Sequence, residues 1–412
     1  MSKVSSNIAW LMLVQCSGYL FPLVMLPYLV RTLGVNNFGI YSIVLAVIQY
    51  GVMLTEFGFN FTSTRDISIK RSEKTEVSKI FFCTIYSKLF LFFIFFSGVI
   101  LYLYYANKIH EYSPLLLAGG LTILANALYP IWFFQGIEKV KIISIVTAIS
   151  RAITLLLTIL LVKTEKDLNM AILVNSFLYI LPSIFGCALI LFSGSVIYVT
   201  VGIKDVYECL KKSFPLFISN VSISLYSTLN TIILGKYSSP VIVGNFAAAD
   251  KLRLAVQGLY APIQQAVFPR ASQIVMQDSG IKKIIKIFGI PFISFGILIS
   301  VFYFFFGEFA VHIYYGEKFT LAGNLFSLMF PLPIIISVAT VFTHWILIAQ
   351  GQNKIVGKIY TLFSIVHLCY VIPFVKEFSA YGMVYSVVLT QSLITLAMII
   401  CVIKTIKRGH EN

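Results

Sequence analysis

Hydrophobic residues form long runs along the whole chain, and short polar stretches separate them. Each run is about 20 residues long, which is the helix length needed to cross the hydrocarbon core of a bilayer. Lipid offers no hydrogen-bond partners, so a spanning segment must satisfy its backbone internally, as a helix does. The pattern predicts an all-α integral membrane protein with twelve transmembrane helices. The predicted spans are residues 8–31, 38–61, 80–105, 113–134, 142–162, 170–193, 214–235, 241–269, 287–306, 321–349, 355–375 and 381–403.

The composition agrees with a membrane protein and excludes a soluble domain. Of the 412 residues, 58% are hydrophobic and 11% are charged, and the mean hydropathy is +0.91. Soluble domains carry about 25% charged residues, so water could not solvate this much apolar surface. The longest polar stretches, near residues 62–79, 194–213 and 270–286, are too short to form a separate domain.

The basic residues are distributed unevenly between the two sides of the predicted membrane. The segments on the side of both termini carry 20 Lys and Arg residues, and the segments on the other side carry 7. Cytoplasmic loops are enriched in Lys and Arg, so this bias predicts that both termini are cytoplasmic. Much of the net charge of +15 therefore reflects topology rather than affinity for nucleic acid.

Two short motifs recur at about half the chain length. LGVNNFGIY at residues 33–41 resembles LGKYSSPVIVGNF at 234–246, and WFFQGIEK at 132–139 resembles WILIAQGQNK at 345–354. We interpret them as traces of two homologous six-helix bundles, residues 1–200 and 201–412. An even number of helices gives both halves the same orientation, and repeats of this kind hold the substrate between them near the midplane. The pattern favours a transporter that works by alternating access.

Charged residues inside the predicted spans of the first half are candidates for function, because an intramembrane charge costs roughly 2.5–3.5 kcal/mol on insertion scales. Glu56 shares a helical face with Asn60 in the second span. Arg151 lies deep in the fifth span, Lys88 lies in the third, and Arg31 ends the first. Snorkelling to the interface or pairing with a neighbour is the alternative for each side chain.

The second half contains two unusually polar spans. Asn220 begins a polar face on the seventh span, which favours a wet lumen, although such residues also mediate helix packing. On the eighth span, Asp250, Arg253 and Gln257 share one face, and Lys251 adds a further charge. Asp250 and Arg253 have the i,i+3 spacing of an ion pair. If they pair, Lys251 leaves one positive charge in the region.

Basic groups outnumber acidic groups among these candidates, so we predict a cationic cavity. Such a cavity concentrates anions, and guanidinium groups bind phosphate through paired hydrogen bonds. The predicted substrate is therefore an anion of the phosphate or pyrophosphate kind. The predicted substrate-binding residues are Arg31, Lys88, Arg151, Asn220, Lys251, Arg253 and Gln257. The candidates for ion coupling or gating are Glu56 and Asp250.

Motifs for chemistry are missing from the sequence. There is no HExxH spacing for a metal, no Walker motif for ATP and no nucleophile motif. We therefore predict no metal, no cofactor and no enzymatic activity. His344 and His367 lie within spans; we interpret them as packed neutral side chains, with a proton relay as the alternative.

The segments LPYLVRTLGVNNFGIYSIV at 26–44 and TEFGFNFTSTRDIS at 55–68 closely resemble the amino-terminal signature of polysaccharide transporters. These are the Wzx-type O-antigen flippases of the multidrug/oligosaccharidyl-lipid/polysaccharide superfamily. The stretches at 132–139 and 244–253 are also similar to that family, although more loosely. The family usually has Asp before FGFN, where this chain has Glu56.

The resemblance implies two six-helix bundles around a V-shaped cavity with cationic residues inside. It also implies transport of an undecaprenyl-pyrophosphate-linked O-antigen or related repeat unit from the cytoplasmic to the periplasmic leaflet of the bacterial inner membrane. The expected partners are this lipid-linked oligosaccharide, the lipid bilayer, H⁺ or Na⁺, and the polysaccharide polymerase and chain-length machinery, with no nucleic acid.

Three other functions remain as alternatives. A cation-coupled drug exporter of the same superfamily would need an acidic cavity, which the positive balance opposes. A membrane polymerase or ligase would need a large periplasmic loop, and the breaks near residues 105–113 and 307–320 are too short for one. A channel is the third alternative.

Overall fold

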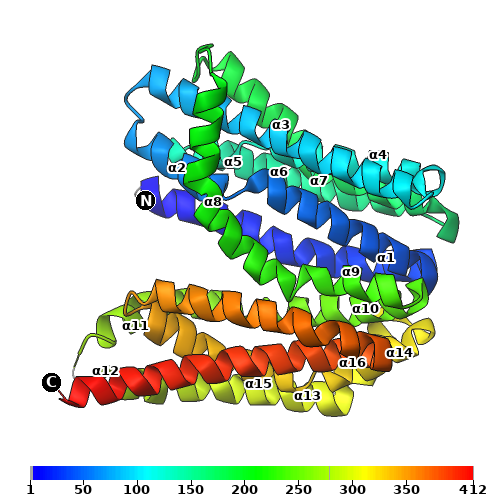
Figure 1. Ribbon diagram of the computed structural model, residues 1–412, viewed down its shortest axis with the longest axis vertical. Helices are drawn as coiled ribbons and strands as arrows, with labels where there is room; N and C mark the ends of the chain where they lie inside the picture. Colours follow the sequence, from blue (N-terminus) through cyan, green and yellow to red (C-terminus); the bar gives the residue numbers. More distant parts are fainter. Residues whose placement is uncertain (1–2, 278, 412) are drawn as a thin grey trace. The chain divides into compact units, whose positions relative to one another are not determined.

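The computed structural model describes the backbone of residues 3–277 and 279–411, and the side chains of residues 17–18, 21–110, 112–277 and 279–404. All regular structure within these ranges is helical (Figure 1), which confirms the all-α prediction. The helices are α1 Lys3–Glu56, α2 Phe59–Ile69, α3 Lys74–Tyr105, α4 Ile109–Leu128, α5 Ile131–Gly136, α6 Val140–Leu161, α7 Leu168–Phe192, α8 Ile203–Leu225, α9 Thr228–Tyr237, α10 Pro240–Gln257, α11 Tyr260–Ile274, α12 Gly280–Ile284, α13 Ile290–Tyr315, α14 Thr320–Leu328, α15 Pro331–Thr340 and α16 Asn353–Glu411. Short 3-10 or π segments are η1 Glu165–Asp167, η2 Ile285–Gly289, η3 Glu317–Phe319 and η4 Val341–Ile348.

Eight helical stretches in the described part of the chain are long and apolar enough to cross a membrane, and the bent pair α8–α9 makes nine. Two of the long helices are broken at a residue with positive φ, α1 at Gly34 (φ 70°) and α16 at Ser379 (φ 53°). Each break falls in a gap between two predicted spans, so α1 and α16 each contain two of them. The chain is a multi-pass membrane protein, and the count of twelve stays a prediction.

The predicted span at 241–269 is both divided and strongly charged. It forms α10 and α11, which are separated at residues 258–259. Three charged side chains on α10 lower its hydropathy, so this pair is not among the apolar stretches above. Charged side chains inside a membrane span raise the free energy of insertion, so we expect those of α10 to have a function.

The chain divides into two compact units, Met1–Val221 and Ser222–Asn412. In unit 1, α4, α6 and α7 pack closely together, and α1 packs against α6 and α4. In unit 2, α13 packs against α14 and α15, and α16 packs against α15, η4 and α9. Most of α8 belongs to unit 1 by its contacts, although the sequence assigns it to the second half. The division into six-helix bundles at residue 200 stays a prediction.

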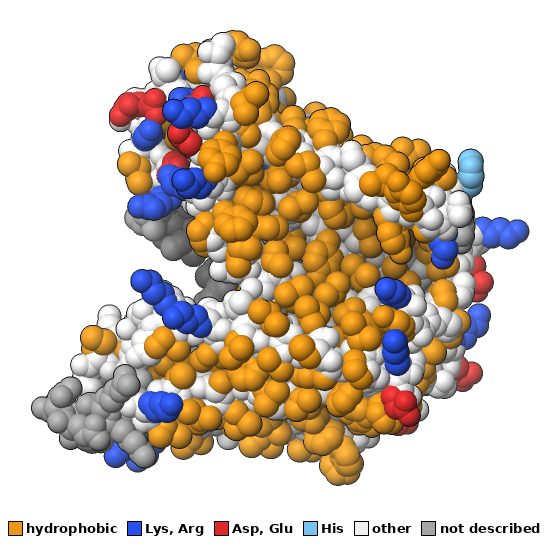
Figure 2. Space-filling model, viewed as in Figure 1, with side chains coloured by type: hydrophobic (Ala, Val, Ile, Leu, Met, Phe, Trp, Pro, Cys, Tyr) orange, Lys and Arg blue, Asp and Glu red, His pale blue; other side chains and the backbone are white. Residues whose placement is uncertain are grey.

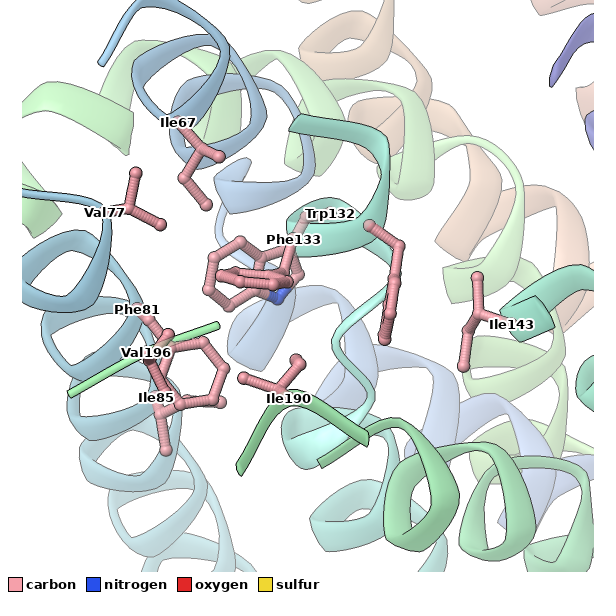
Figure 3. Close-up of a cluster of buried hydrophobic side chains, with 10 residues drawn as sticks. Ile67, Val77, Phe81, Ile85, Trp132, Phe133, Ile143, Ile190 and Val196 are labelled. Carbon is pink, nitrogen blue, oxygen red and sulfur yellow. The ribbon is translucent and has the colours of Figure 1, made fainter. Parts of the chain in front are cut away.

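A cluster of aromatic side chains forms one core of unit 1. Trp132 and Phe133 of α5 are fully buried, and the ring of Phe81 from α3 lies 5.9 Å from that of Trp132 and 5.4 Å from that of Phe133. Aliphatic side chains of α2, α6 and α7 complete the cluster, including Ile67 and Ile143 (Figure 3). The aromatic residues of the WFFQGIEK motif therefore lie in a core where five helices pack together, namely α2, α3, α5, α6 and α7.

The second copy of this motif has the same role in unit 2. Trp345 of η4 is fully buried, like Trp132, and its ring centroid lies 5.1 Å from that of Phe292 on α13. The indole Nε1 of Trp345 donates to the carbonyl of Gln264 at 3.3 Å. Each copy thus places a buried tryptophan against a phenylalanine of a neighbouring long helix, which favours the interpretation as two homologous halves.

The surface is apolar along the helices. Figure 2 shows a face that is mostly hydrophobic, with Lys, Arg, Asp and Glu side chains gathered toward the helix ends. Large side chains such as Phe305 and Phe309 on α13 are more than half exposed. A soluble protein avoids such continuous apolar surface, and lipid is the solvent that accommodates it.

Candidate functional site

Unit 1 has a buried acid and base at its centre. Glu56 is the last residue of α1 and is half-buried, and Lys88 of α3 is only 1% exposed. Glu56 and the thiol of Cys187 on α7 both lie within electrostatic range of the Lys88 ammonium. A buried charge requires a partner, since an isolated ion pays a large desolvation penalty. Glu56 is the carboxylate whose charge acts on the buried Lys88 ammonium.

Arg151 lies on the face of α6 that packs against α1. Its guanidinium Nη1 donates to the hydroxyl of Ser17 at 2.5 Å. A Cβ at Gly18 would stand 3.4 Å from two guanidinium nitrogens, which is ordinary van der Waals contact, so α1 packs closely against this side chain. The neighbouring Thr147 and Thr154 are buried on the same helix. Local packing therefore fixes where the guanidinium lies.

Two tyrosines lie within electrostatic range of both Arg151 and Glu56. The rings of Tyr129, which follows α4, and Tyr179 of α7 lie 6.4 Å apart, and both interact electrostatically with Arg151. Both also lie within range of Glu56, and the Tyr129 hydroxyl is 2.8 Å from Thr147 Oγ1. Glu56, Lys88, Arg151 and the two tyrosines thus form one polar cluster, which we call the unit 1 cluster.

The predicted ion pair on α10 is present in unit 2. Arg253 donates through Nε and Nη2 to Asp250 Oδ1 at 2.8 and 2.7 Å, and through Nη1 to Gln257 Oε1 at 2.7 Å. Asp250 also acts electrostatically on Lys251. The region therefore contains one carboxylate and two basic groups, which leaves one net positive charge. We call these four residues the unit 2 cluster.

A small cavity adjoins the unit 2 cluster. Its volume is about 10 Å³, which is about enough for one water molecule. Its wall is formed by Arg253, Gln257, Tyr260 and Tyr303 together with apolar side chains. The Tyr260 hydroxyl donates to the carbonyl of Pro333 at 3.0 Å, which fixes that wall. Arg253 therefore borders a mostly apolar space that is too small for a sugar as it stands.

Arg31 and Asn220 are exposed, unlike the residues of the two clusters. The hydroxyl of Tyr28, three residues before Arg31, donates to the carbonyl of Val162 just after the end of α6. Arg31 thus lies near the end of α6, and Arg151 lies nearly three turns back along it. Asn220 is on α8. The structure brings Glu56, Lys88 and Arg151 together in unit 1 but leaves Arg31 and Asn220 outside that cluster.

A polar cleft of about 230 Å³ lies between α2, α3 and α8 within unit 1. Two ion pairs across it connect α8 to the first helices: Lys212 pairs with Asp66, and Lys79 Nζ lies 2.8 Å from Asp205 Oδ1. The predicted cytoplasmic stretches 62–79 and 194–213 both contribute to its lining. The cleft contains the charged end of the TEFGFNFTSTRDIS signature.

The first half of the same signature packs against α8. The rings of Phe57 and Phe217 are stacked with centroids 4.3 Å apart, and Thr62 Oγ1 lies 2.7 Å from Ser213 Oγ. Gly58 between α1 and α2 adopts φ 87°, in the left-handed region that favours glycine. The backbone changes direction at Gly58, and this allows side chains of α2 to contact α8.

We expect Gly58→Ala to destabilise the protein by at least about 1 kcal/mol, since the substitution adds backbone strain and a clash. A Cβ at this position would stand 2.8 Å from Leu216 Cβ. Gly98→Ala on α3 is the matched control, because nothing lies within 4 Å of its added Cβ. Thermal unfolding of both purified variants checks this; equal melting temperatures would contradict the described close packing.

Comparison with known proteins identifies the family. A family model described as "Polysaccharide biosynthesis protein" matches residues 4–275. A Shigella dysenteriae protein named "Putative O-antigen transporter" is 35% identical over 396 residues, which cover 96% of this chain and 99% of that protein. The chain belongs to the polysaccharide biosynthesis protein family. An Escherichia coli (strain K12) member of the same name is 33% identical over 404 residues and 96% of each chain.

Solved structures agree with this family in fold. A structure titled "Lipid II flippase MurJ, inward closed conformation" matches with a TM-score of 0.72 and 16% identity, over 96% of this chain and 87% of that chain. A multidrug resistance MATE family transporter matches with a TM-score of 0.63 and 11% identity, over 96% and 99%. Because the related family members carry the name of a transporter, the prediction that the chain is not an enzyme is confirmed.

Proposed function

We propose that this chain is a flippase for an undecaprenyl-pyrophosphate-linked O-antigen or related polysaccharide repeat unit. It moves the unit from the cytoplasmic to the periplasmic leaflet of the bacterial inner membrane, with both of its termini in the cytoplasm. The observation that carries the proposal is the 35% identity, over 96% of the chain, to a relative named for O-antigen transport. The shared fold with a lipid II flippase supports the same class of cargo.

The physical task is to shield polar groups from lipid. A glycan hydroxyl without a hydrogen bond costs several kcal/mol in hydrocarbon, so spontaneous crossing is very slow. A polar path through the protein removes this barrier while the lipid tail stays in the bilayer. Alternating access, with two halves that rock about a central cavity, exposes the path to one leaflet at a time.

The unit 1 cluster is the proposed binding site for the pyrophosphate. Arg151 provides a planar guanidinium, whose geometry suits paired hydrogen bonds to phosphate oxygens. Lys88 adds positive charge, and the hydroxyls of Tyr129 and Tyr179 are further donors. In unit 2, Lys251 and Arg253 extend the positive field, and Gln257 hydrogen-bonds Arg253. Arg31 and Asn220, both exposed, are assigned to the approach of the substrate.

The membrane potential favours the proposed direction of transport. A cell interior that is negative repels an anionic headgroup by about 2.3 kcal/mol per charge per 100 mV. Entry of H⁺ or Na⁺ would add to this driving force, with Glu56 and Asp250 as the proposed coupling or gating groups. Delivery to the outer leaflet supplies the polysaccharide polymerase and chain-length machinery, which are the proposed downstream partners.

A genetic experiment tests the proposed function. The gene for this chain is expressed in a bacterial strain that lacks its own O-antigen flippase but synthesises the matching repeat unit. We expect surface polysaccharide to return to the level given by the native flippase, as measured by gel profiles of lipopolysaccharide. Accumulation of lipid-linked repeat units in the cytoplasmic leaflet, despite normal levels of the protein, would refute the proposal.

A further inference from the structure

The connection between α7 and α8 is fixed to α3 just before α8 begins. Val196 lies in the aromatic core of unit 1. The backbone N–H of Ile197 donates to Ser78 Oγ at 2.9 Å. One turn further along α3, the ring of Phe82 lies 5.7 Å from that of Tyr198. We call these contacts the first anchor.

A second anchor holds the following part of α8. Cys209, Leu210 and Phe217 pack against a buried cluster of unit 1 that includes Phe57. Residues 199–208 lie between the two anchors and contain the beginning of α8. This stretch therefore depends on its own side chains for contact with the helices beside it.

Between the anchors, one carboxylate has two roles. Asp205 Oδ2 accepts from the backbone N–H of Gly202 at 3.0 Å, which stabilises the start of α8 because the first N–H groups of a helix lack intrahelical partners. Asp205 Oδ1 lies 2.8 Å from Nζ of Lys79 on α3. Within the described ranges, this is the only hydrogen bond or ion pair that joins residues 199–208 to α2 or α3. The same carboxylate thus caps α8 and ties it to α3.

Residues 199–208 border the polar cleft between α2, α3 and α8, and Asp205 and Lys79 line that cleft. The outer face of this stretch is hardly packed, since Ile203 is 91% exposed and Tyr207 is 62% exposed. An exposed ion pair stabilises a fold only weakly, and segments with few buried contacts open at a low free energy. We propose that residues 199–208 form a lid over this cleft and that the Lys79–Asp205 pair is its latch.

The charges around the latch explain why the closed lid needs Lys79. Asp205 and Glu208 both line the cleft, and they lie three residues apart on α8, where like charges repel each other. Lys79 offsets this repulsion while it is paired. Without Lys79, the beginning of α8 frays more often, and opening exposes Cys83, which lines the cleft from α3 and is 7% exposed in the closed form. Salt screens exposed pairs, so the lid opens more often as the ionic strength rises.

Amide hydrogen exchange of the whole protein in lipid nanodiscs measures how often the lid opens. Lys79→Met removes the charge of the latch and keeps an apolar stem of similar length. We expect exchange at residues 203–208 to become about two- to fivefold faster, which is the effect of losing one exposed ion pair. Lys79→Arg keeps the charge and should retain most of the protection. Raising NaCl from about 0.05 to about 1 M should accelerate exchange in the wild type but not in Lys79→Met.

The matched control is Lys70→Met, because Lys70 lines the same cleft but pairs with Glu76, which lies outside the lid. The two lysine side chains are also similarly exposed, 45% for Lys70 and 43% for Lys79. Lys70→Met should leave exchange at residues 203–208 unchanged. Equal exchange rates in the wild type and Lys79→Met would overturn the latch, and so would an equal acceleration in Lys70→Met.

Labelling of Cys83 distinguishes opening of the cleft from fraying of the helix alone. In a chain whose other five cysteines are replaced by alanine, a neutral maleimide should modify Cys83 about two- to fivefold faster with Lys79→Met. Lys79 lies within electrostatic range of this thiol, and loss of a positive charge by itself disfavours the reactive thiolate, so faster labelling reports exposure. An unchanged rate would overturn the lid. Neither measurement requires flipping, so the proposed function can fail while the lid stands, and the reverse.

Discussion

Arg151→Ala should reduce delivery of the glycan to the periplasm about ten- to a hundredfold. Hydrogen bonds to a charged group contribute about 1.5–3 kcal/mol, and tenfold corresponds to about 1.4 kcal/mol. Arg151 is the guanidinium of the unit 1 cluster, and its Nη1 donates to the hydroxyl of Ser17. The measurement is the rate at which lipid-linked glycan becomes accessible outside the inner membrane, at matched protein levels.

Two further variants make this result specific. Arg71→Ala removes an exposed guanidinium, which lies 2.8 Å from Glu138, and should leave delivery unchanged. Arg151→Lys keeps the charge but loses the planar geometry, so it should fall between the wild type and alanine. Full delivery by Arg151→Ala would refute the role of the unit 1 cluster in binding the pyrophosphate.

Glu56→Gln should destabilise the protein by about 1–3 kcal/mol, because it removes the carboxylate whose charge acts on the buried Lys88 ammonium. Replacing both residues, as Glu56→Gln with Lys88→Met, should recover most of that loss, since no buried charge remains. Thermal unfolding of the detergent-solubilised variants gives the comparison.

The control for this prediction is a carboxylate on the surface. Glu138→Gln also removes a partner of a basic residue, but the Arg71–Glu138 pair is about half exposed, and exposed pairs contribute about 0–1 kcal/mol. A double variant no more stable than Glu56→Gln alone would show that Lys88 does not depend on Glu56.

The sequence predicted the helical fold well, because hydrophobic runs of spanning length leave few alternatives to helices. The breaks at Gly34 and Ser379 fall where the polar gaps predicted them. The sequence did not reveal that the predicted eighth span is divided at residues 258–259, or that most of α8 packs with unit 1. These features depend on contacts between distant segments, which hydropathy does not encode.

The candidate site was predictable only within single helices. The i,i+3 spacing predicted the pair of Asp250 and Arg253 because both lie on α10. Spacing could not show that Glu56 of α1 acts electrostatically on Lys88 of α3, since those helices meet only in the folded chain. Tyr129 and Tyr179 were missed; with 23 tyrosines in the chain, no pattern marks these two.

His367 illustrates the same limit. Its place in a span left both a packed neutral ring and a proton relay open as interpretations. The structure shows a buried ring whose hydrogen-bond partners come from α9 and from the arm of α16 that follows Ser379. These partners lie far from His367 along the chain, so only the three-dimensional structure shows them.

Flipping by the purified protein tests the central claim most directly. The chain is reconstituted into liposomes that contain undecaprenyl-pyrophosphate-linked repeat units in both leaflets, and a membrane-impermeant reagent modifies the glycans that reach the outside. We predict that nearly all of the glycan becomes modified with the wild type, whereas only the outer-leaflet half is modified in protein-free liposomes or, over the same time, with Arg151→Ala. Modification that stops at the outer-leaflet half with correctly folded wild type would contradict the account.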